Sequence, residues 1–443
     1  MGKCFSTVRP LWLSGAIALL CLTTYGRGLT LPPISDDYLQ IQLGREYGPL
    51  EQWPALAADA LYRCRATSIL LTHWTERWLG LAPLWLNLSS LLVHFVNCCL
   101  VAALGIWRPV GFVLSIPAAL IFCILERPHE AVLWYSALPE LLVFTFTLAA
   151  LLAWIQYAQT GRPRWYIATG VAFALALLSK ESAVVFVPLA FAIAGWRRDL
   201  WWRLVPAVAV SLLYFLSIHG ARDNHVHFND GTFSLSAPFW VTELRTTGRL
   251  LALWGSLALL ILATYKRDWR ILTGCLAWMG VTLLPYSFLT YQSAAPSRHT
   301  YLAAVGLAFL LAAAWHTLRD RFPHRRPWLA VLATLFVLHQ TTYVWAYKHH
   351  QFVERAKPTE QLLTIAKTHR GPIQLRCFPF PRQIAELALS VTNASGVWIA
   401  AEEEYAAIEL NFCSASSTTQ QTAGTEYSNT ASIPDPHPTP APR

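Results

Sequence analysis

Charged residues are scarce in this sequence. Asp, Glu, Lys and Arg make up 13% of its 443 residues, about half the share usual in soluble proteins, and 55% of the residues are hydrophobic. So few charges leave too little polar surface to cover a water-soluble fold of this size. The composition excludes an ordinary soluble enzyme and indicates a membrane protein.

Apolar runs of roughly 17 to 22 residues recur along the chain, long enough to cross about 30 Å of hydrocarbon as helices. About eleven can be counted. They lie near residues 10–27, 81–104, 109–125, 137–157, 164–179, 182–196, 202–218, 247–264, 270–289, 301–318 and 328–346. Several are short or contain proline, and 164–179 with 182–196 can form an incomplete hairpin. The sequence predicts an all-α polytopic membrane protein.

Acidic residues are outnumbered, 25 against 34 Lys and Arg, and the net charge is +9. Cytoplasmic loops collect Lys and Arg. With Lys3 and Arg9 inside, every second connection is basic: Arg108; Arg162 and Arg164; Arg197, Arg198 and Arg203; Lys266, Arg267 and Arg270; Arg319, Arg321, Arg325 and Arg326. The opposite connections carry Asp36, Asp37, Glu46, Glu51, Asp59, Glu76, Glu126, Glu130, Asp223 and Asp230. The pattern predicts a cytoplasmic N-terminus, an uncleaved signal anchor and an exported C-terminus. The positive charge reports topology, and no nucleic-acid partner is expected.

Cysteines with the spacing of a metal site are also lacking among the nine in the chain. Cys98 and Cys99 are adjacent within a helix, and four others have the setting of small membrane-buried residues: Cys4, Cys21, Cys123 and Cys275. Cys64, Cys377 and Cys413 should face the oxidising side, where a Cys377–Cys413 disulfide can form.

Composition divides the chain into three parts. Residues 1–347 form the membrane part, with exported loops at 28–80 and 219–246; the first loop reads as amphipathic helices rich in Trp, suited to the lipid interface. Residues 348–413 combine helical and strand patterns and predict a small α/β domain outside the membrane. Residues 414–443 have almost nothing to bury and predict a disordered tail.

Two adjacent carboxylates, Asp36 and Asp37, follow the first apolar run in "LPPISDDYLQ". Alone, they have a simple explanation, because Ser35 is a good helix N-cap and acids in a first turn favour the helix dipole. Ionisable residues gather at the same side of the membrane, where they are costly unless paired or functional. They occur in "YRCRATS", "ERPHEAVLWYSALPELL", "LLSKESA" and "SRHTYLAAVG".

The order of these features resembles the GT-C glycosyltransferases, which take sugar from a polyprenyl-phosphate carrier and include the protein O-mannosyltransferases and their tetratricopeptide-containing relatives. The matching stretches between about residues 8 and 318 are Asp36-Asp37, "WLNLSSLLVHFVNCCL", "PHEAVLWYSALPELLVFTFTLAA", "LALLSKESAVVFVPL" and "SRHTYLAAVGLAFLLAAA". Two positions depart from the family: Arg127-Pro128 stands in place of His-Pro, and Pro139 precedes Glu140. No tetratricopeptide repeats follow.

The resemblance implies transfer of a sugar from a polyprenyl phosphate to an exported acceptor, with Asp36, or else Asp37, as the base. Transfer also needs positive charge on the departing phosphate. The candidates are Arg65, Arg127, Lys180 and Arg298. For each of them the alternative is contact with lipid headgroups, and Lys180 and Glu181 could neutralise each other.

Other polar residues of these stretches have less specific roles. His129, Glu130 and Glu140 are candidates for positioning acceptor or donor, although His129 and Glu130 could instead cap a helix. His94 and Asn97 are expected to hydrogen-bond between helices. Asp36, Asp37 and Glu130 could hold a divalent metal, but no spacing demands one, and no cofactor is required. For "RDNHVHFND" at 222–230, a polar loop is preferred over a metal site.

Two other classes of function stay open: a non-catalytic GT-C-like assembly partner, and a membrane transporter. Against a transporter, the charges gather at one face of the membrane and no duplicated broken-helix pattern is visible. The bacterial inner membrane is the preferred location. The sugar, the acceptor and the stereochemistry are left open.

Overall fold

The structure, a computed structural model, describes residues 10–220, 233–266, 269–290, 294–394, 396–401 and 408–413. The sequence "RDNHVHFND" and the predicted disordered tail lie outside the described residues. Helices dominate the described part, as the apolar runs predict.

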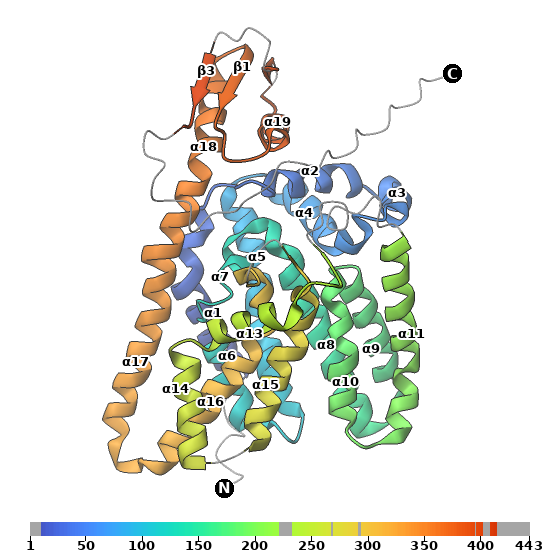
Figure 1. The fold of residues 1–443 in the computed structure, drawn as a ribbon, viewed down its shortest axis with the longest axis vertical. Helices are drawn as coiled ribbons and strands as arrows, with labels where there is room; N and C mark the ends of the chain where they lie inside the picture. The colour runs from blue at the N-terminus through green and yellow to red at the C-terminus, as the bar shows by residue number, and fades with distance from the viewer. Residues whose placement is uncertain are drawn as a thin grey trace.

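A bundle of helices forms the body of the molecule (Figure 1). Its members are α1 (Pro10–Tyr25), α5 (Pro83–Ala103), α6 (Gly111–Phe122), α8 (Leu138–Thr160), α9 (Pro163–Leu177), α10 (Phe186–Ala194), α11 (Arg198–Gly220), α13 (Phe239–Leu251), α14 (Trp254–Ile261), α15 (Trp269–Leu283), α16 (Ala304–Arg321) and α17 (Arg326–Thr342). Leu, Val, Ala and Phe side chains of these helices form one continuous core cluster, which includes α16 along nearly its whole length.

Four helical stretches are long and apolar enough to cross a membrane, counted over the described residues, or five if a bent pair is one span. The four are Pro83–Ile106, Tyr135–Thr160, Arg198–Gly220 and Pro323–Thr368. Several other predicted runs form shorter helices, such as α6 and α10, so the number of eleven spans stays a prediction.

Short helices cover one end of the bundle (Figure 1). They are α2 (Asp37–Tyr47), α3 (Trp53–Ala58) and α4 (Ala66–Leu79), and they confirm the helices predicted for the first exported loop. Trp53 and Trp78 are exposed there. The short helix α7 (His129–Leu133) leads into α8 from the same end.

A single rod runs from the opposite end of the bundle past this layer. It consists of α17, a π-helix at Tyr343–Lys348 and α18 (His349–Thr368). Beyond it lie β1 (Gly371–Arg376), α19 (Arg382–Val391), β2 (Val397–Ile399) and β3 (Ile408–Asn411), which match the helix and strand patterns predicted after residue 348.

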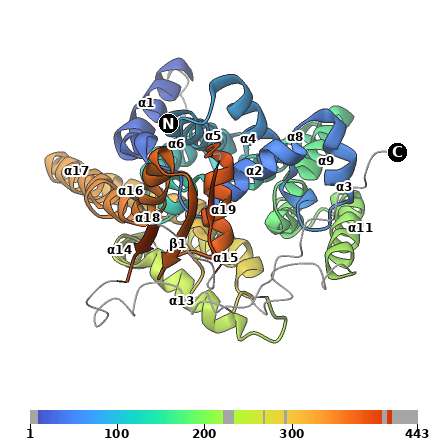
Figure 2. The same cartoon turned by 90° about the horizontal axis from the view of Figure 1, so that it is seen from above.

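The strands form a parallel sheet in the order β2-β1-β3, with Ile373 of β1 opposite both Ile399 and Ile408. Its buried face packs on α18 and α19 in a cluster apart from the bundle core: Leu362, Ala366, Ile373, Ala385, Leu389, Val397 and Ile399. Seen from above, β1 and α19 lie over the bundle (Figure 2). Cys377 and Cys413 form a disulfide, which confirms that prediction.

Candidate functional site

Asp36 and Asp37 lie in a tight turn at the covered end of the bundle, and their side chains have different surroundings. Asp37 is buried, and its two carboxylate oxygens accept the main-chain N–H groups of Ile34 (2.8 Å) and Ser136 (2.6 Å). Asp36 is half-buried, and its Oδ1 accepts the Ser35 hydroxyl at 3.2 Å. Asp37 therefore fixes the turn to the segment before α8. The Asp36 carboxylate, in contrast, accepts no main-chain N–H group among the described residues.

The prediction that Ser35 is the N-cap is wrong, whereas Asp37 does lie in the first turn of α2, where an acid favours the helix dipole. Asp36, not Ser35, precedes the first residue of α2, and no side-chain capping hydrogen bond forms. Ser35 instead has φ of 49°, a left-handed conformation that costs free energy for a residue with a β-carbon. Such strain is typical of functional turns.

Burial has the largest effect on the pKa values of Asp36 and Asp37. It raises the pKa of Asp36, and Arg298 and Arg355 partly oppose this rise. Burial also raises the pKa of Asp37 to about 7, against the two main-chain hydrogen bonds. A carboxyl with a raised pKa is better suited to accept a proton near neutrality.

The segment Ser297–Tyr301 makes hydrogen bonds to three other parts of the bundle. The Ser297 hydroxyl donates to Arg127 O at 2.5 Å, the Arg298 N–H donates to Glu130 Oε2 at 3.2 Å, and Tyr301 OH lies 2.6 Å from His94 Nδ1. These contacts reach the element before α7, α7 itself and α5. The sequence "SRHTY" is thus an organising segment of the site.

Arg298 lies beside an aromatic ring and a carboxylate. Its guanidinium carbon is 4.8 Å from the ring centre of Trp134, and its Nη1 is 4.0 Å from Glu130 Oε2. The guanidinium of Arg355, from α18, is 5.1 Å from the same ring centre. Burial alone would raise the pKa of Glu130, but His129, which is charged at acid pH, the charges of Arg298 and Arg355 and the hydrogen bond from the Arg298 N–H together lower it.

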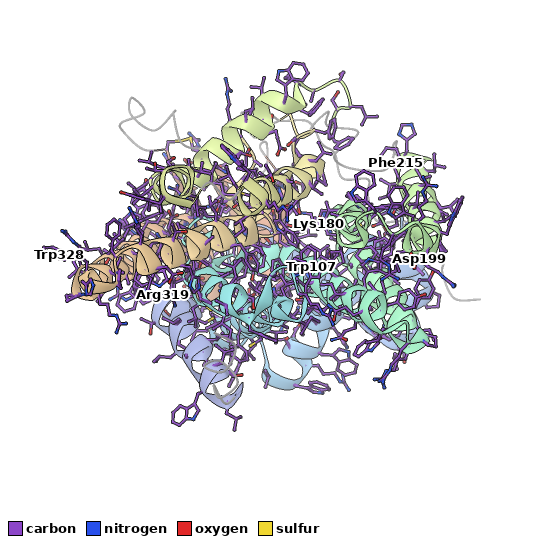
Figure 3. The ribbon with its side chains drawn as sticks, turned by 90° about the horizontal axis from the view of Figure 1, so that it is seen from below. Trp107, Lys180, Asp199, Phe215, Arg319 and Trp328 are labelled. Atoms are coloured by element: carbon purple, nitrogen blue, oxygen red, sulfur yellow. A yellow bond between two sulfur atoms is a disulfide. The ribbon has the colours of Figure 1, made fainter. Side chains whose placement is uncertain are left out.

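A second polar cluster is buried between α8 and the break after α9. Lys180 pairs with Glu140 Oε1, and His299 Nδ1 lies 2.5 Å from the same oxygen. Tyr286 donates to Glu140 Oε2 at 2.6 Å, and its ring stacks on that of His299. Seen from the N-terminal end, Lys180 lies between Trp328 and Asp199 at opposite sides of the molecule (Figure 3).

The remaining predicted phosphate ligands are paired with acids. Arg65 Nη2 lies 3.5 Å from Glu181 Oε2, and Arg127 Nε lies 3.0 Å from Glu126 Oε1. The prediction that Lys180 and Glu181 neutralise each other is wrong, since their ion-pair partners are Glu140 and Arg65. Adjacent residues at a helix break point to different neighbours.

Three histidine and asparagine predictions have structural outcomes. His129 is buried, with Nδ1 2.8 Å from Glu126 O and 3.2 Å from Ser297 Oγ, and burial lowers its pKa to about 4. It is therefore neutral near pH 7. Asn97 donates to Leu141 O and accepts the Thr145 hydroxyl, and His94 contacts Tyr301. The predicted hydrogen bonding of His94 and Asn97 between helices is confirmed.

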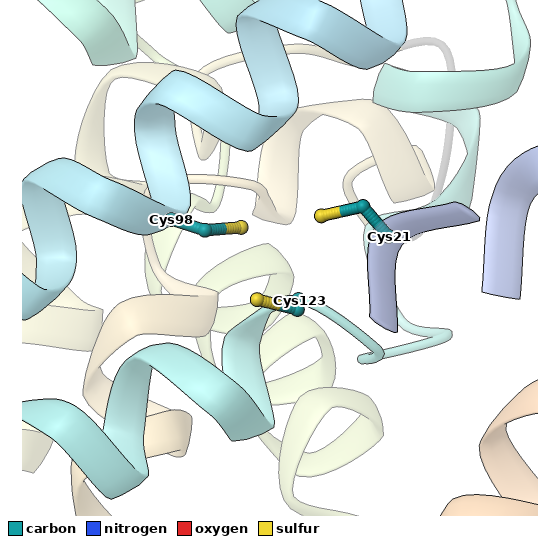
Figure 4. A group of neighbouring side chains, drawn as sticks. All are labelled: Cys21, Cys98 and Cys123. Atoms are coloured by element: carbon teal, nitrogen blue, oxygen red, sulfur yellow. The ribbon is translucent and has the colours of Figure 1, made fainter. Parts of the chain in front are cut away.

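Three cysteines that spacing does not connect are brought together by the fold. The sulfur atoms of Cys21, Cys98 and Cys123 all lie within 4.8 Å of one another, and all three residues are buried. They come from α1, α5 and the end of α6, and their side chains point toward one another (Figure 4). Within the described ranges this is the one group of three or more His, Cys, Asp or Glu side chains close enough to share a metal ion, and Asp36, Asp37 and Glu130 do not form such a group. Thiolates suit soft ions such as Cu(I).

Sequence reasoning missed Arg355 and Trp134 as site residues. The signal for Arg355 is the stripe Phe352, Ala356 and Thr359, which is buried at helical spacing and places residue 355 on the inner side of α18. Trp134 carries no such signal, since an aromatic residue in an apolar stretch is ordinarily part of the core.

Comparison with known proteins bears on this arrangement. Residues 86–219, from α5 to α11, match the family model described as dolichyl-phosphate-mannose-protein mannosyltransferase. No curated protein sequence matches the chain. Among solved structures, ArnT from Cupriavidus metallidurans in the apo state is similar, with a TM-score of 0.52 at 12% identity, over 88% of this chain and 89% of that chain.

The chain has the GT-C fold. The predicted helical GT-C-like fold and the small C-terminal strands are thereby confirmed, whereas the number of membrane spans stays a prediction. Asp36, Arg298 and Arg355 lie outside the residues matched by the family model, so their roles in a GT-C site rest on geometry.

Proposed function

We propose that this protein is an integral-membrane glycosyltransferase that moves a sugar, a hexose or a pentose, from a polyprenyl-phosphate carrier to an exported protein, glycan or lipid. The observation that carries this proposal is Asp36, a half-buried carboxylate within electrostatic reach of Arg298 and Arg355. A base next to cations is what transfer from a phosphate carrier requires.

The position of the site relative to the expected membrane interface supports a lipid-linked donor. Trp345 donates to Thr24 O near the end of α1 at 3.0 Å, and Lys348 lies over the rings of Tyr343 and Tyr347. Aromatic and basic residues of this kind are typical of a membrane interface. The helix Pro323–Thr368 has 46 residues, whereas about 20 span the hydrocarbon, so α18 stands outside the membrane. A carrier phosphate would lie at this level.

In the proposed reaction, the acceptor hydroxyl or amine gives its proton to Asp36 while its oxygen or nitrogen attacks the anomeric carbon. The bond from that carbon to the phosphate oxygen breaks, and the phosphate leaves with one more negative charge. Arg298 is assigned to this charge, because its 4.0 Å distance to Glu130 is the longest ion pair made by the four predicted phosphate ligands. Asp37 holds the turn that presents Asp36.

Other predicted residues have supporting roles in this proposal. Glu130 orients Arg298 through the main-chain N–H, and His129 ties the α7 segment to Ser297. Glu140 and Lys180 form the buried pair that holds His299, next to Arg298. Arg65 and Arg127, each paired with an acid, would reach a phosphate only after exchanging partners.

We propose the bacterial inner membrane as the location, with the N-terminus cytoplasmic. Exposed basic residues near the N-terminal end of the molecule, such as Arg162, Arg198 and Arg326, agree with cytoplasmic loops. The Cys377–Cys413 disulfide at the other end agrees with an oxidising compartment.

Residues 1–347 are proposed as the membrane domain, and 348–413 as an exported domain with its own apolar cluster. This division leaves α18 as the connection between the two, and the tail at 414–443 as a separate segment.

An assay of donor consumption tests the function. Purified protein in lipid is incubated with a panel of radiolabelled polyprenyl-phosphate sugars and an extract of exported acceptors. We expect loss of label from one carrier and its appearance in an acceptor. Binding without consumption would support a non-catalytic partner, and counterflow of an unchanged substrate in proteoliposomes would support a transporter.

A further inference from the structure

An arginine from the far end of the chain enters the candidate site. Arg355 of α18 lies over the ring of Trp134, as Arg298 does, and also over Phe352 at 5.5 Å. The two guanidinium carbons are 5.1 and 4.8 Å from one ring centre, so they are no farther apart than the sum of these distances. Two cations therefore share one aromatic ring.

The packing of α18 holds Arg355 on the inner side. Phe352, Ala356 and Thr359 are buried, and the Phe352 ring contacts that of His129 edge-to-face at 6.4 Å. Glu354 and Lys357 of the same helix are exposed and pair with each other. Glu354 and Lys357 thus neutralise each other at the surface, whereas Arg355 lies over the ring of Trp134, whose indole N–H donates to Ile34 O beside the Asp36 turn.

A second anchor fixes the far end of the unit that carries α18. Arg45 of α2 donates to Val391 O at the end of α19 at 2.8 Å, and pairs with Glu76 of α4 at 2.8 Å. The unit beyond α18 is therefore attached to the layer that also contains Asp36. Arg355 therefore lies between two contacts that hold this unit in place, the one of Phe352 with His129 and the one of Arg45 with Val391.

Neither Arg298 nor Arg355 has a close ion-pair partner at the Trp134 ring. Arg355 makes no ion pair within 4.0 Å among the described residues, and Arg298 reaches Glu130 only at 4.0 Å. Two cations at one ring repel each other. The carboxylates of Asp36 and Glu130 reduce this repulsion, since both arginines lower the pKa of each, but neither carboxylate makes an ion pair with Arg355 among the described residues. Guanidinium groups bind phosphate with paired N–H donors, and an aromatic face keeps such groups in place.

We propose that Arg355 is the second ligand of the carrier phosphate, acting with Arg298, and that Trp134 sets the spacing of the two. This inference rests on the proposed function and extends it: α18 completes the donor site, and the C-terminal unit is needed to hold it. The class of ligand is a phosphate monoester or diester on a prenyl chain.

Binding of farnesyl phosphate to the full-length protein in nanodiscs tests this inference. The variants are Arg355→Gln, Arg355→Lys and Arg298→Gln, and the matched control is Lys357→Gln, an exposed cation on the same helix. Farnesol, which lacks the phosphate, controls for binding of the chain. Thermal unfolding of each variant shows whether it has folded.

We expect Arg355→Gln to weaken farnesyl phosphate binding about tenfold or more and to leave farnesol binding unchanged. Arg355→Lys should retain much of the affinity, and Lys357→Gln should match the wild type. Weakening by Arg298→Gln but not by Arg355→Gln would overturn this inference alone. Absence of farnesyl phosphate binding in the wild type would overturn the proposed function together with it.

Discussion

His299 Nδ1 lies 2.5 Å from Oε1 of Glu140, an oxygen that also pairs with Lys180. The next residue back, Arg298, donates its main-chain N–H to Glu130. The buried pair and the candidate phosphate site are thus joined by one peptide unit. Loss of the Glu140–Lys180 pair should therefore change phosphate binding, even though Glu140 takes no part in the proposed reaction.

Removal of one member of the buried pair should destabilise the protein strongly. Glu140→Gln or Lys180→Met leaves the other charge buried without its partner, which costs about 3–5 kcal/mol. The double variant should lose less than the sum of the singles, since it leaves no lone charge. Thermal unfolding in detergent measures all three, with Arg197→Gln at an exposed pair as the control. Additive losses would show that Glu140 and Lys180 do not act as a pair.

Stability should depend on pH through Asp37. Burial raises its pKa to about 7 in the folded protein, above the ordinary value of 3.8, so the folded state binds the proton more tightly than the unfolded chain. This contribution to stability is complete below about pH 4 and is lost as the pH rises through 7. Asp37→Asn removes the titration and should flatten the difference in unfolding temperature between pH 5 and pH 8. An unchanged difference would contradict the assignment.

The acid limb of activity should follow Asp36. A base must be deprotonated, so activity should fall as the pH drops through the pKa of Asp36, which burial raises above 3.8. Arg298, the hydrogen bond from Ser35 and Arg355 lower that pKa and so partly oppose the effect of burial. Arg298→Gln should therefore move the acid limb to higher pH, whatever it does to the maximum rate. Arg65 pairs with Glu181, so Arg65→Gln should leave the acid limb unchanged. Equal shifts of the acid limb in the two variants would contradict the assignment of Asp36 as the base.

The disulfide should stabilise the C-terminal unit that contains β1, α19, β2 and β3. Cys377 and Cys413 are separated by 36 positions, and loops of this size are stabilised by about 2–4 kcal/mol. Intact-mass measurement with and without reductant should show one disulfide, and Cys377→Ser should abolish the difference. Reduction should also make β1 and α19 more sensitive to protease. Two free thiols at these positions in the protein purified without reductant would contradict both the pairing and the oxidising location.

Local patterns predicted most of the elements, because period and composition act over short distances. The apolar runs, the helices of the first loop and the strands "PIQLRCF" and "GVWIA" all appear near their predicted places. The charged residues that gather at the same end of the helices favour a functional role for the Asp36-Asp37 pair, and the choice of Asp36 as base comes from the resemblance to the GT-C family and stays a prediction. The charge pattern shows on which side of the membrane the charged residues lie, but not which of them are in contact.

Pairings across the fold could not be predicted in the same way. Lys180 and Glu181 are neighbours in sequence, yet their partners come from α8 and from the segment before α4. Cys21, Cys98 and Cys123 meet because three helices converge, which no spacing encodes. Arg355 belongs to a segment interpreted as separate from the membrane part, although its guanidinium lies over the ring of Trp134, in the segment between α7 and α8. Such residues become visible only when the helices are packed.

The most direct test compares Asp36→Asn with two other acids of the same loop, Asp37→Asn and the exposed Glu51→Gln, for consumption of a radiolabelled polyprenyl-phosphate sugar. All three should insert and purify like the wild type, as judged by size-exclusion profiles. We predict that Asp36→Asn abolishes consumption, that Asp37→Asn reduces it through a loosened turn, and that Glu51→Gln leaves it unchanged. Full consumption by Asp36→Asn would contradict the central claim that this carboxylate is the base.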